Sequence, residues 1–169
     1  MTQRIVVTGS ESTGKTTLAG ELAASYQARL GPEMARASAQ QLLAGGFTLA
    51  ADDVAPTARR AIAAEDAALA GDPPRVFLDT DLISTVVYAR HYYGSCPAWI
   101  ETTARERMGA RYLLCAPDLP WVADGVRDPP AHPEEVHELF QPGMLDFGSR
   151  VADADGLVRS RAPTARAHA

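Results

Sequence analysis

Residues 4–16 read RIVVTGSESTGKT, and the fold class can be inferred from this segment outward. Its first part, residues 4–8, is rich in β-branched residues and predicts a short buried strand. Its second part matches the pattern Gly-x-x-x-x-Gly-Lys-Ser/Thr in full, from Gly9 to Thr16. A helix is predicted directly after it, over residues 16–29, because apolar residues recur there at helical spacing. A strand, a glycine-rich turn and a helix in this order predict a phosphate-binding loop.

The spacing of this loop has a chemical reason. Glycines let backbone N–H groups curl around a phosphate at the positive N-terminus of the following helix. Lys15 would bridge the β- and γ-phosphates of ATP, and the Thr16 hydroxyl would bind Mg²⁺. We therefore predict ATP and Mg²⁺ as cofactors. The predicted nucleotide-binding residues are contiguous: Gly9, Ser10, Glu11, Ser12, Thr13, Gly14, Lys15, Thr16 and Thr17.

The composition draws attention to the same lysine. Of the 16 basic residues, 15 are arginine and one is Lys15. Such a bias indicates that arginine has replaced lysine wherever either side chain serves. A lysine kept against this bias marks a position that needs a compact ammonium group, as between two phosphates.

Strands and helices alternate along the rest of the chain. Further strands are predicted at 75–79, 111–116 and 150–155, with a weak extended segment at 30–34. Helices are predicted at 35–44, 50–70 (on the surface), 82–93, 98–108 and 134–147, the last interrupted at Pro142-Gly143. This alternation predicts an α/β three-layer sandwich, with a parallel sheet covered by helices on both faces.

Two segments are not predicted to be regular. Residues 117–133 contain five prolines and one glycine, which predicts a long loop. The residues from 157 to 169 are poor in apolar side chains and are predicted to be a flexible tail. The expected domain organisation is therefore a single kinase-sized domain over 1–156, with a lid at about 117–133.

Two carboxylates follow the strand predicted at 75–79. Asp79 lies at its end, where residues of open α/β sheets face ligands. A carboxylate there can bind Mg²⁺ directly or through water, so Asp79 joins Thr16 as a predicted metal ligand. Asp81 could hold the metal or a substrate hydroxyl, or it could instead cap the helix that begins near residue 82.

Two further segments carry candidate catalytic groups. Glu33 could take the proton from a hydroxyl that attacks the γ-phosphate, and Arg36 could neutralise charge nearby. The alternative for Glu33 is an exposed or capping carboxylate. On the proline-rich loop, Arg127 could close over the transferring phosphoryl group, or it could pair with a neighbouring aspartate at the surface.

Aromatic side chains gather after the second buried strand. Four polar-tipped aromatics fall within twelve residues, from Tyr88 to Trp99. Such a cluster is more often core than pocket, yet it also suits a flat heterocycle or a sugar. Trp121 on the long loop could stack on a ring or pin the loop to the core. The candidate substrate contacts are Arg36, Tyr88, Tyr92, Trp121 and Asp124.

Composition excludes several other classes of protein. The net charge is −5, and no basic run occurs, which disfavours nucleic acid as a partner. Two cysteines, Cys96 and Cys115, are too few for a disulfide framework or a zinc site. No apolar run reaches the roughly 18 residues of a membrane span, and no signal-peptide pattern is seen, which predicts a cytoplasmic protein.

Four motifs occur together: GSESTGKTTL at 9–18, PEMAR at 32–36, FLDTDLIST at 77–85 and WVADGVR at 121–127. In this order they resemble the nicotinamide riboside (ribosylnicotinamide) kinase domain of NadR-type proteins, a branch of the P-loop kinases among the AAA-like ATPases. The resemblance implies phosphorylation of the 5′-hydroxyl of nicotinamide riboside, giving nicotinamide mononucleotide in NAD salvage. It also implies a five-stranded parallel sheet of strand order 2-3-1-4-5. The predicted catalytic residues are Lys15, Glu33, Asp79, Asp81 and Arg127, and each of them lies in one of these motifs.

Other functions remain open at this point. Another nucleoside or nucleotide kinase would use the same acidic residues. A noncatalytic ATP-binding sensor is a further alternative, and homo-oligomers are possible for either. A GTP-binding switch is disfavoured because its Asn/Thr-Lys-x-Asp motif needs a second lysine, and Lys15 is the only one. The expected partner is a small-molecule nucleoside.

Overall fold

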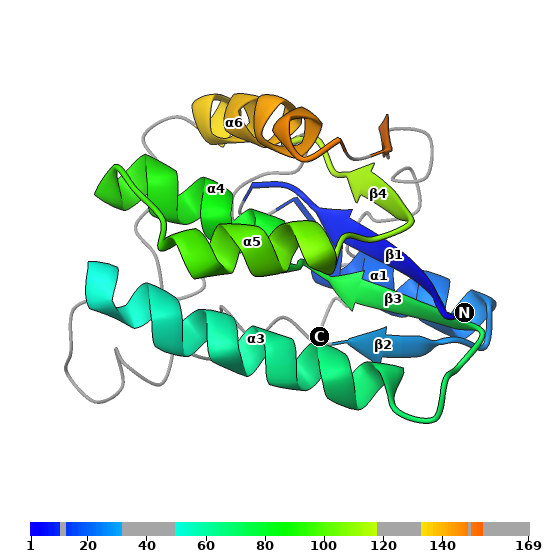
Figure 1. Ribbon diagram of the computed structural model, residues 1–169. Helices are drawn as coiled ribbons and strands as arrows, with labels where there is room; N and C mark the ends of the chain where they lie inside the picture. The colour runs from blue at the N-terminus through cyan, green and yellow to red at the C-terminus, as the bar shows by residue number, and fades with distance from the viewer. Residues whose placement is uncertain (11–12, 32–49, 118–132, 149, 154–169) are drawn as a thin grey trace, which may run out of the picture.

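The computed structural model describes residues 1–10, 13–31, 50–117, 133–148 and 150–153 (Figure 1). Within them, one five-stranded sheet has the order β2-β3-β1-β4-β5, and every neighbouring pair is parallel. This confirms the predicted α/β fold and strand order. The strands are β1 (Gln3–Thr8), β2 (Arg29–Gly31), β3 (Arg75–Asp79), β4 (Arg111–Leu114) and β5 (Val151–Asp153).

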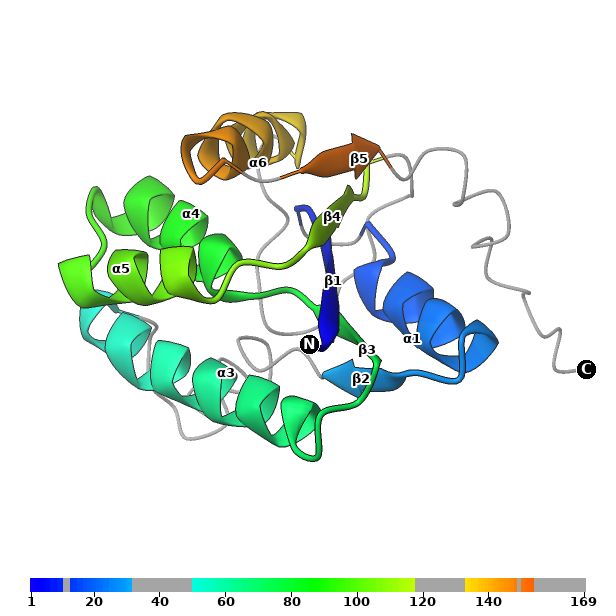
Figure 2. The ribbon, with the colours of Figure 1, turned by 45° about the vertical axis from the view of Figure 1, so that its right-hand side comes forward.

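Helices cover both faces of the sheet. Of the described helices, Figure 2 shows α1 on one side and α3, α4, α5 and α6 on the other. The helices are α1 (Lys15–Ser25), the short 3-10 helix η1 (Ala51–Asp53), α3 (Val54–Leu69), α4 (Leu82–Tyr93), α5 (Ala98–Glu106) and α6 (Pro133–Asp146).

Each face of the sheet has its own apolar core, and β1 contributes to both. Val6 packs in the larger core under α3 to α6, and Val7 packs against Leu18 and Ala19 of α1. Successive side chains of a strand point to opposite faces, which is why adjacent residues of β1 serve different cores. A strand buried on both faces reads as a continuous apolar run, as residues 5–7 do.

Helix α3 lies where the sequence predicts a surface helix, and one of its faces is buried. It is amphipathic, and its inner face buries Val54, Ala58 and Ala68 against the larger core. Glu65 is also buried on this face, where its carboxylate accepts hydrogen bonds from Arg4 at 2.9 Å and Arg107 at 3.3 Å. The guanidinium groups offset the cost of burying this charge. The surface helix predicted at 50–70 is therefore confirmed, and its inner face also contributes to the larger core.

Helix α6 runs through Pro142 without a break, so the predicted interruption there was wrong. Phe140 and Met144, on either side of the proline, are both fully buried in the larger core. Their packing holds the helix together across the missing hydrogen bond. Gly143 lies on the inner side as well, because a Cβ at this position would sit 2.8 Å from Cγ2 of Val87 in α4.

Alanine substitution at two helix glycines, one crowded and one not, should change the stability of the protein in opposite directions. Gly20→Ala in α1 meets nothing within 4 Å, so the better helix propensity of alanine should raise the free energy of unfolding by about 0.5–1 kcal/mol. Gly143→Ala pushes α6 off α4 and should lower it by about 1 kcal/mol. Urea unfolding of the two variants measures both changes. Unchanged or increased stability in Gly143→Ala would show that α4 and α6 do not pack this closely.

No helix among the described residues is both long and apolar enough to cross a membrane.

Cys96 and Cys115, both within the described part of the chain, form no disulfide. Burial raises the pKa of the Cys96 thiol to about 11, and the nearby Glu101 carboxylate adds to the rise. The thiol is therefore protonated near neutral pH.

Candidate active site

The phosphate-binding loop begins at the carboxyl end of β1, where it contacts the residue that follows β4. Gly9 has φ +139°, and a Cβ there would lie 2.6 Å from the carbonyl oxygen of Cys115. The N–H of Cys115 in turn donates to the carbonyl of Thr8 at 2.8 Å. Gly14 adopts the left-handed conformation at the N-cap of α1, with φ 75°. Both positions of the motif therefore favour glycine. A side chain at Gly9 would clash with Cys115, and both residues have a positive φ that other residues rarely adopt.

The Lys15 side chain folds back over this loop. It is only 8% exposed, and its ammonium donates a hydrogen bond of 2.6 Å to the carbonyl oxygen of Ser10. The Thr13 hydroxyl donates to the same oxygen at 2.9 Å. Thr16 and Thr17, in the first turn of α1, are exposed. Of the predicted nucleotide-binding residues, Glu11 and Ser12 lie outside the described residues.

Asp79 ends β3 on the same face of the sheet as α1. It pairs in register with Val7, whose side chain packs against α1. In-register residues of parallel neighbours share a face, so the carboxylate points toward the helix that begins at Lys15. Asp79 is 2% exposed. The structure therefore brings the two strand ends and the start of α1 together, as the sequence predicts.

Asp81 takes a different direction, although it is only two residues further on. One carboxylate oxygen accepts from the N–H of Ile83 at 3.0 Å, which makes Asp81 the N-cap of α4. The other accepts from the hydroxyl of Tyr112 at 2.7 Å, and Tyr112 belongs to the larger core on the opposite face. Burial raises the pKa of Asp81 to about 6, against the lowering effect of these two hydrogen bonds.

Thr80 makes this divergence possible. It has φ 65°, a left-handed conformation that β-branched residues rarely adopt. Such a residue costs of order 1–3 kcal/mol, and it persists only where its surroundings hold it. Its N–H donates to the carbonyl of Val7 at 2.9 Å, which ties the turn to β1. The turn thereby sends the two carboxylates to opposite faces of the sheet.

A contact between the end of β1 and the start of α4 was not predicted from the sequence. The hydroxyls of Thr8 and Ser84 lie 2.9 Å apart and are both buried. Thr8 is the last residue of β1, and Ser84 is in the first turn of α4. The sequence signal that could have indicated this contact is Thr8 itself, a hydroxyl residue at the end of an otherwise apolar run.

The tyrosines of α4 form a stack that leads from the core to the surface. The rings of Tyr88 and Tyr92 are parallel with centroids 6.0 Å apart, and Tyr88 also meets Phe140 of α6 edge-on at 5.4 Å. Tyr88 is half-buried, whereas Tyr92 is 56% exposed. The stack thus has one packed end and one accessible end.

Several predicted residues lie outside the described part of the chain, and so do the expected lid and tail. The residues concerned are Glu33, Arg36, Trp121, Asp124 and Arg127.

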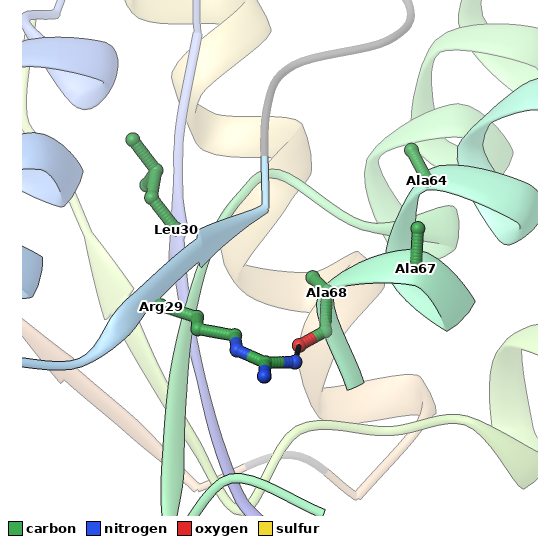
Figure 3. Close-up of a pocket in the computed structure, with 5 residues that line it drawn as sticks. All are labelled: Arg29, Leu30, Ala64, Ala67 and Ala68. Carbon is green, nitrogen blue, oxygen red and sulfur yellow. Dashed lines mark hydrogen bonds between the residues drawn. The ribbon is translucent and has the colours of Figure 1, made fainter. Parts of the chain in front are cut away.

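A shallow pocket of about 500 Å³ lies elsewhere, between β2 and α3 (Figure 3). It is lined by Arg29, Leu30 and three alanines of α3. The guanidinium of Arg29 donates to the carbonyls of Ala68, at 3.3 Å, and Ala70 at the C-terminus of α3, where a cation is favoured. The polar group of this pocket is thus engaged in capping a helix, and the pocket is separate from the phosphate-binding loop.

Comparison with known proteins supports the assignment of a P-loop fold. A family described as "AAA domain" matches residues 4–161. No curated protein matches. A crystal structure of NadR in complex with NR superposes with a TM-score of 0.76 at 29% identity, covering 91% of this chain and 46% of the NadR chain. A NadR structure with NAD and AMP-PNP gives a TM-score of 0.72 at 27% identity, covering 91% and 44%.

A more distant structure shares the fold alone. Thymidylate kinase from Ehrlichia chaffeensis superposes with a TM-score of 0.62 at 16% identity, covering 90% of this chain and 86% of the kinase. The chain spans less than half of the length of the NadR chains that it matches. Its fold is that of the P-loop nucleotide and nucleoside kinases, and by the match over nearly all its residues the chain belongs to the AAA domain family.

Proposed function

We propose that the chain is an ATP-dependent kinase that phosphorylates the 5′-hydroxyl of nicotinamide riboside to give nicotinamide mononucleotide. The proposal rests chiefly on the positions of Lys15 and Asp79. Both lie at the carboxyl end of the sheet, on the face covered by α1 and beside the glycine loop. The likeness to NadR structures that hold NR, or NAD and AMP-PNP, supports the choice of substrate.

The donor set of the site fits Mg²⁺. Asp79 supplies a carboxylate and Thr16 a hydroxyl, and Mg²⁺ prefers such oxygen ligands, supplemented by water and substrate phosphates. These two residues would hold the ion. When bound, Mg²⁺ would offset the negative charge of the β- and γ-phosphates. Magnesium dependence is therefore part of the proposal.

Lys15 has the central role among the residues of the chain. Its ammonium now contacts the Ser10 carbonyl and would exchange this contact for the β- and γ-phosphate oxygens of ATP. There it would stabilise the charge that spreads over the phosphoryl group during transfer. The backbone N–H groups of the loop would bind the β-phosphate.

Proton transfer and closure are assigned to residues elsewhere in the chain. Glu33 is the proposed base for the attacking hydroxyl, with Asp79 as the alternative, because the Asp81 carboxylate is engaged with Ile83 and Tyr112 on the other face of the sheet. Arg127 is proposed to approach the transferring phosphoryl group. Tyr88, Tyr92, Trp121, Arg36 and Asp124 are the proposed substrate contacts.

A nucleoside panel tests the choice of substrate. The purified chain is incubated with ATP, Mg²⁺ and one nucleoside at a time, nicotinamide riboside included, and ADP release is followed, with Asp79→Ala as the control. We expect Asp79-dependent turnover with nicotinamide riboside. Turnover of another nucleoside alone would contradict the substrate and keep the kinase. Binding of ATP with no turnover of any nucleoside would contradict the kinase and favour a sensor.

A further inference from the structure

The hydroxyl of Tyr112 joins three parts of the chain inside the larger core. Tyr112 lies in β4 and is fully buried. Its oxygen accepts a hydrogen bond of 2.9 Å from the N–H of Gly109 and donates one of 2.7 Å to Asp81. The hydroxyl therefore has a fixed direction, since its donor is committed to the carboxylate. Asp81 in turn caps α4 through the N–H of Ile83.

We infer that Tyr112 is a positioning residue for the metal site: its hydroxyl, acting through Asp81, holds the turn at 79–81 in the shape that points Asp79 toward α1. The inference rests on the proposed function, because Asp79 is the proposed Mg²⁺ ligand. The turn contains a left-handed threonine, Thr80, so it needs contacts on both sides to keep this shape.

Those contacts lie on either side of the strained residue. Before it, Asp79 is paired with Val7 in the sheet, and the N–H of Thr80 itself donates to Val7. After it, Asp81 is held by Tyr112 from one side and by Ile83 from the other. Removal of the Tyr112 hydroxyl leaves the half-buried Asp81 carboxylate with one hydrogen bond fewer. The turn can then relax by moving Asp81 toward solvent, and Asp79 changes direction with it.

The test is nucleotide-dependent binding of Mn²⁺, a spectroscopic substitute for Mg²⁺, measured by electron paramagnetic resonance in the presence of ADP. Tyr112→Phe keeps the ring that fills the core and removes the hydroxyl alone. We expect roughly tenfold weaker Mn²⁺ binding, as for other residues that orient metal ligands. Unchanged Mn²⁺ affinity in Tyr112→Phe would overturn the inference.

Thr103→Val is the matched control for stability. It also removes a hydroxyl with a short hydrogen bond, to the carbonyl of Trp99 at 2.7 Å, but it does so in α5, outside the turn. If the control weakens Mn²⁺ binding as much as Tyr112→Phe does, the effect is one of general stability and the inference fails. We expect the control to bind Mn²⁺ within twofold of the unaltered chain.

A double-mutant cycle shows whether Tyr112 acts through Asp79. In an Asp79→Asn background, Tyr112→Phe should produce no further loss of Mn²⁺ affinity, because the ligand that it positions is already gone. Additive losses, or no Mn²⁺ binding by the unaltered chain, would overturn the inference. If the cycle shows coupling and no nucleoside is phosphorylated, the proposed function fails while the positioning role stands.

Discussion

Lys15→Ala should lower kcat/KM for phosphoryl transfer by about 10³-fold, or about 4 kcal/mol of transition-state stabilisation. The ammonium would be the positive group that the phosphate-binding loop itself supplies to the β- and γ-phosphates. The fold should survive, since the contact that Lys15 makes with the Ser10 carbonyl is local to the loop. The measurements are steady-state kinetics together with the melting temperature.

Two control variants separate the position of the ammonium from its charge. Lys15→Arg keeps the positive charge, but its planar guanidinium is bulkier than the ammonium, which lies in a nearly buried position 2.6 Å from the Ser10 carbonyl oxygen, so activity should stay low. Arg59→Ala removes one positive charge from the exposed side of α3, where the guanidinium stacks on Trp99 at 4.8 Å, and should leave kinetics unchanged. If Lys15→Ala retained activity within tenfold, the loop would not be the site of phosphoryl transfer.

Asp79→Asn should lower kcat by roughly 10²-fold or more and raise the Mg²⁺ concentration needed for half-maximal activity. Asparagine has nearly the same shape as aspartate, so the buried position at the end of β3 stays filled and the melting temperature should change little. A large loss of activity without a loss of stability is the expected signature of a functional carboxylate. The measurement is a Mg²⁺ titration of the initial rate.

Asp81→Asn is the matched control, because it makes the same change two residues further along. Asparagine is a good N-cap, so it can keep the bond from Ile83, and its amide can still pair with Tyr112. We expect activity within about tenfold of the unaltered chain. Equal losses in the Asp79 and Asp81 variants would contradict the assignment of the two carboxylates to opposite faces and different roles.

The strand, loop and helix around Lys15 were predictable because their signals are local. A buried strand, two glycines at fixed spacing and an amphipathic helix follow one another within about 26 residues. Each of these elements is predicted from the residues that form it, without knowledge of its packing partners. The position of Asp79 at the end of β3 was predictable for a similar reason, since it ends an apolar run in the sequence. The order of the five strands came from the resemblance to a kinase family, and the observed order confirms it.

The role of Asp81 could not be decided from the sequence. Both readings, a functional carboxylate and a helix cap, fit a residue between a strand and a helix. The structure shows the cap, together with a hydrogen bond to Tyr112, which lies 31 residues away in the chain. That contact depends on the register of β4 against β1, where Tyr112 pairs with Val6, and no local pattern encodes it.

The buried face of α3 and the continuity of α6 could not be predicted from the sequence for the same reason. Alanine suits either an exposed or a buried helix face, so the alanine-rich stretch of α3 does not reveal that Ala58 and Ala68 are buried. Proline normally breaks a helix, yet α6 continues through Pro142 because its neighbours are anchored in the core. In both cases tertiary packing decides, and packing partners lie far away in the sequence.

The central claim is that the chain transfers the γ-phosphoryl group of ATP to a nucleoside hydroxyl. The most direct measurement uses ATP labelled in its γ-phosphate, with nicotinamide riboside as acceptor, and follows the label by chromatography. We predict that the label moves to nicotinamide mononucleotide with the unaltered chain and remains in ATP with Lys15→Ala. Label that appears only as inorganic phosphate, or that stays in ATP with the unaltered chain as well, would contradict the claim.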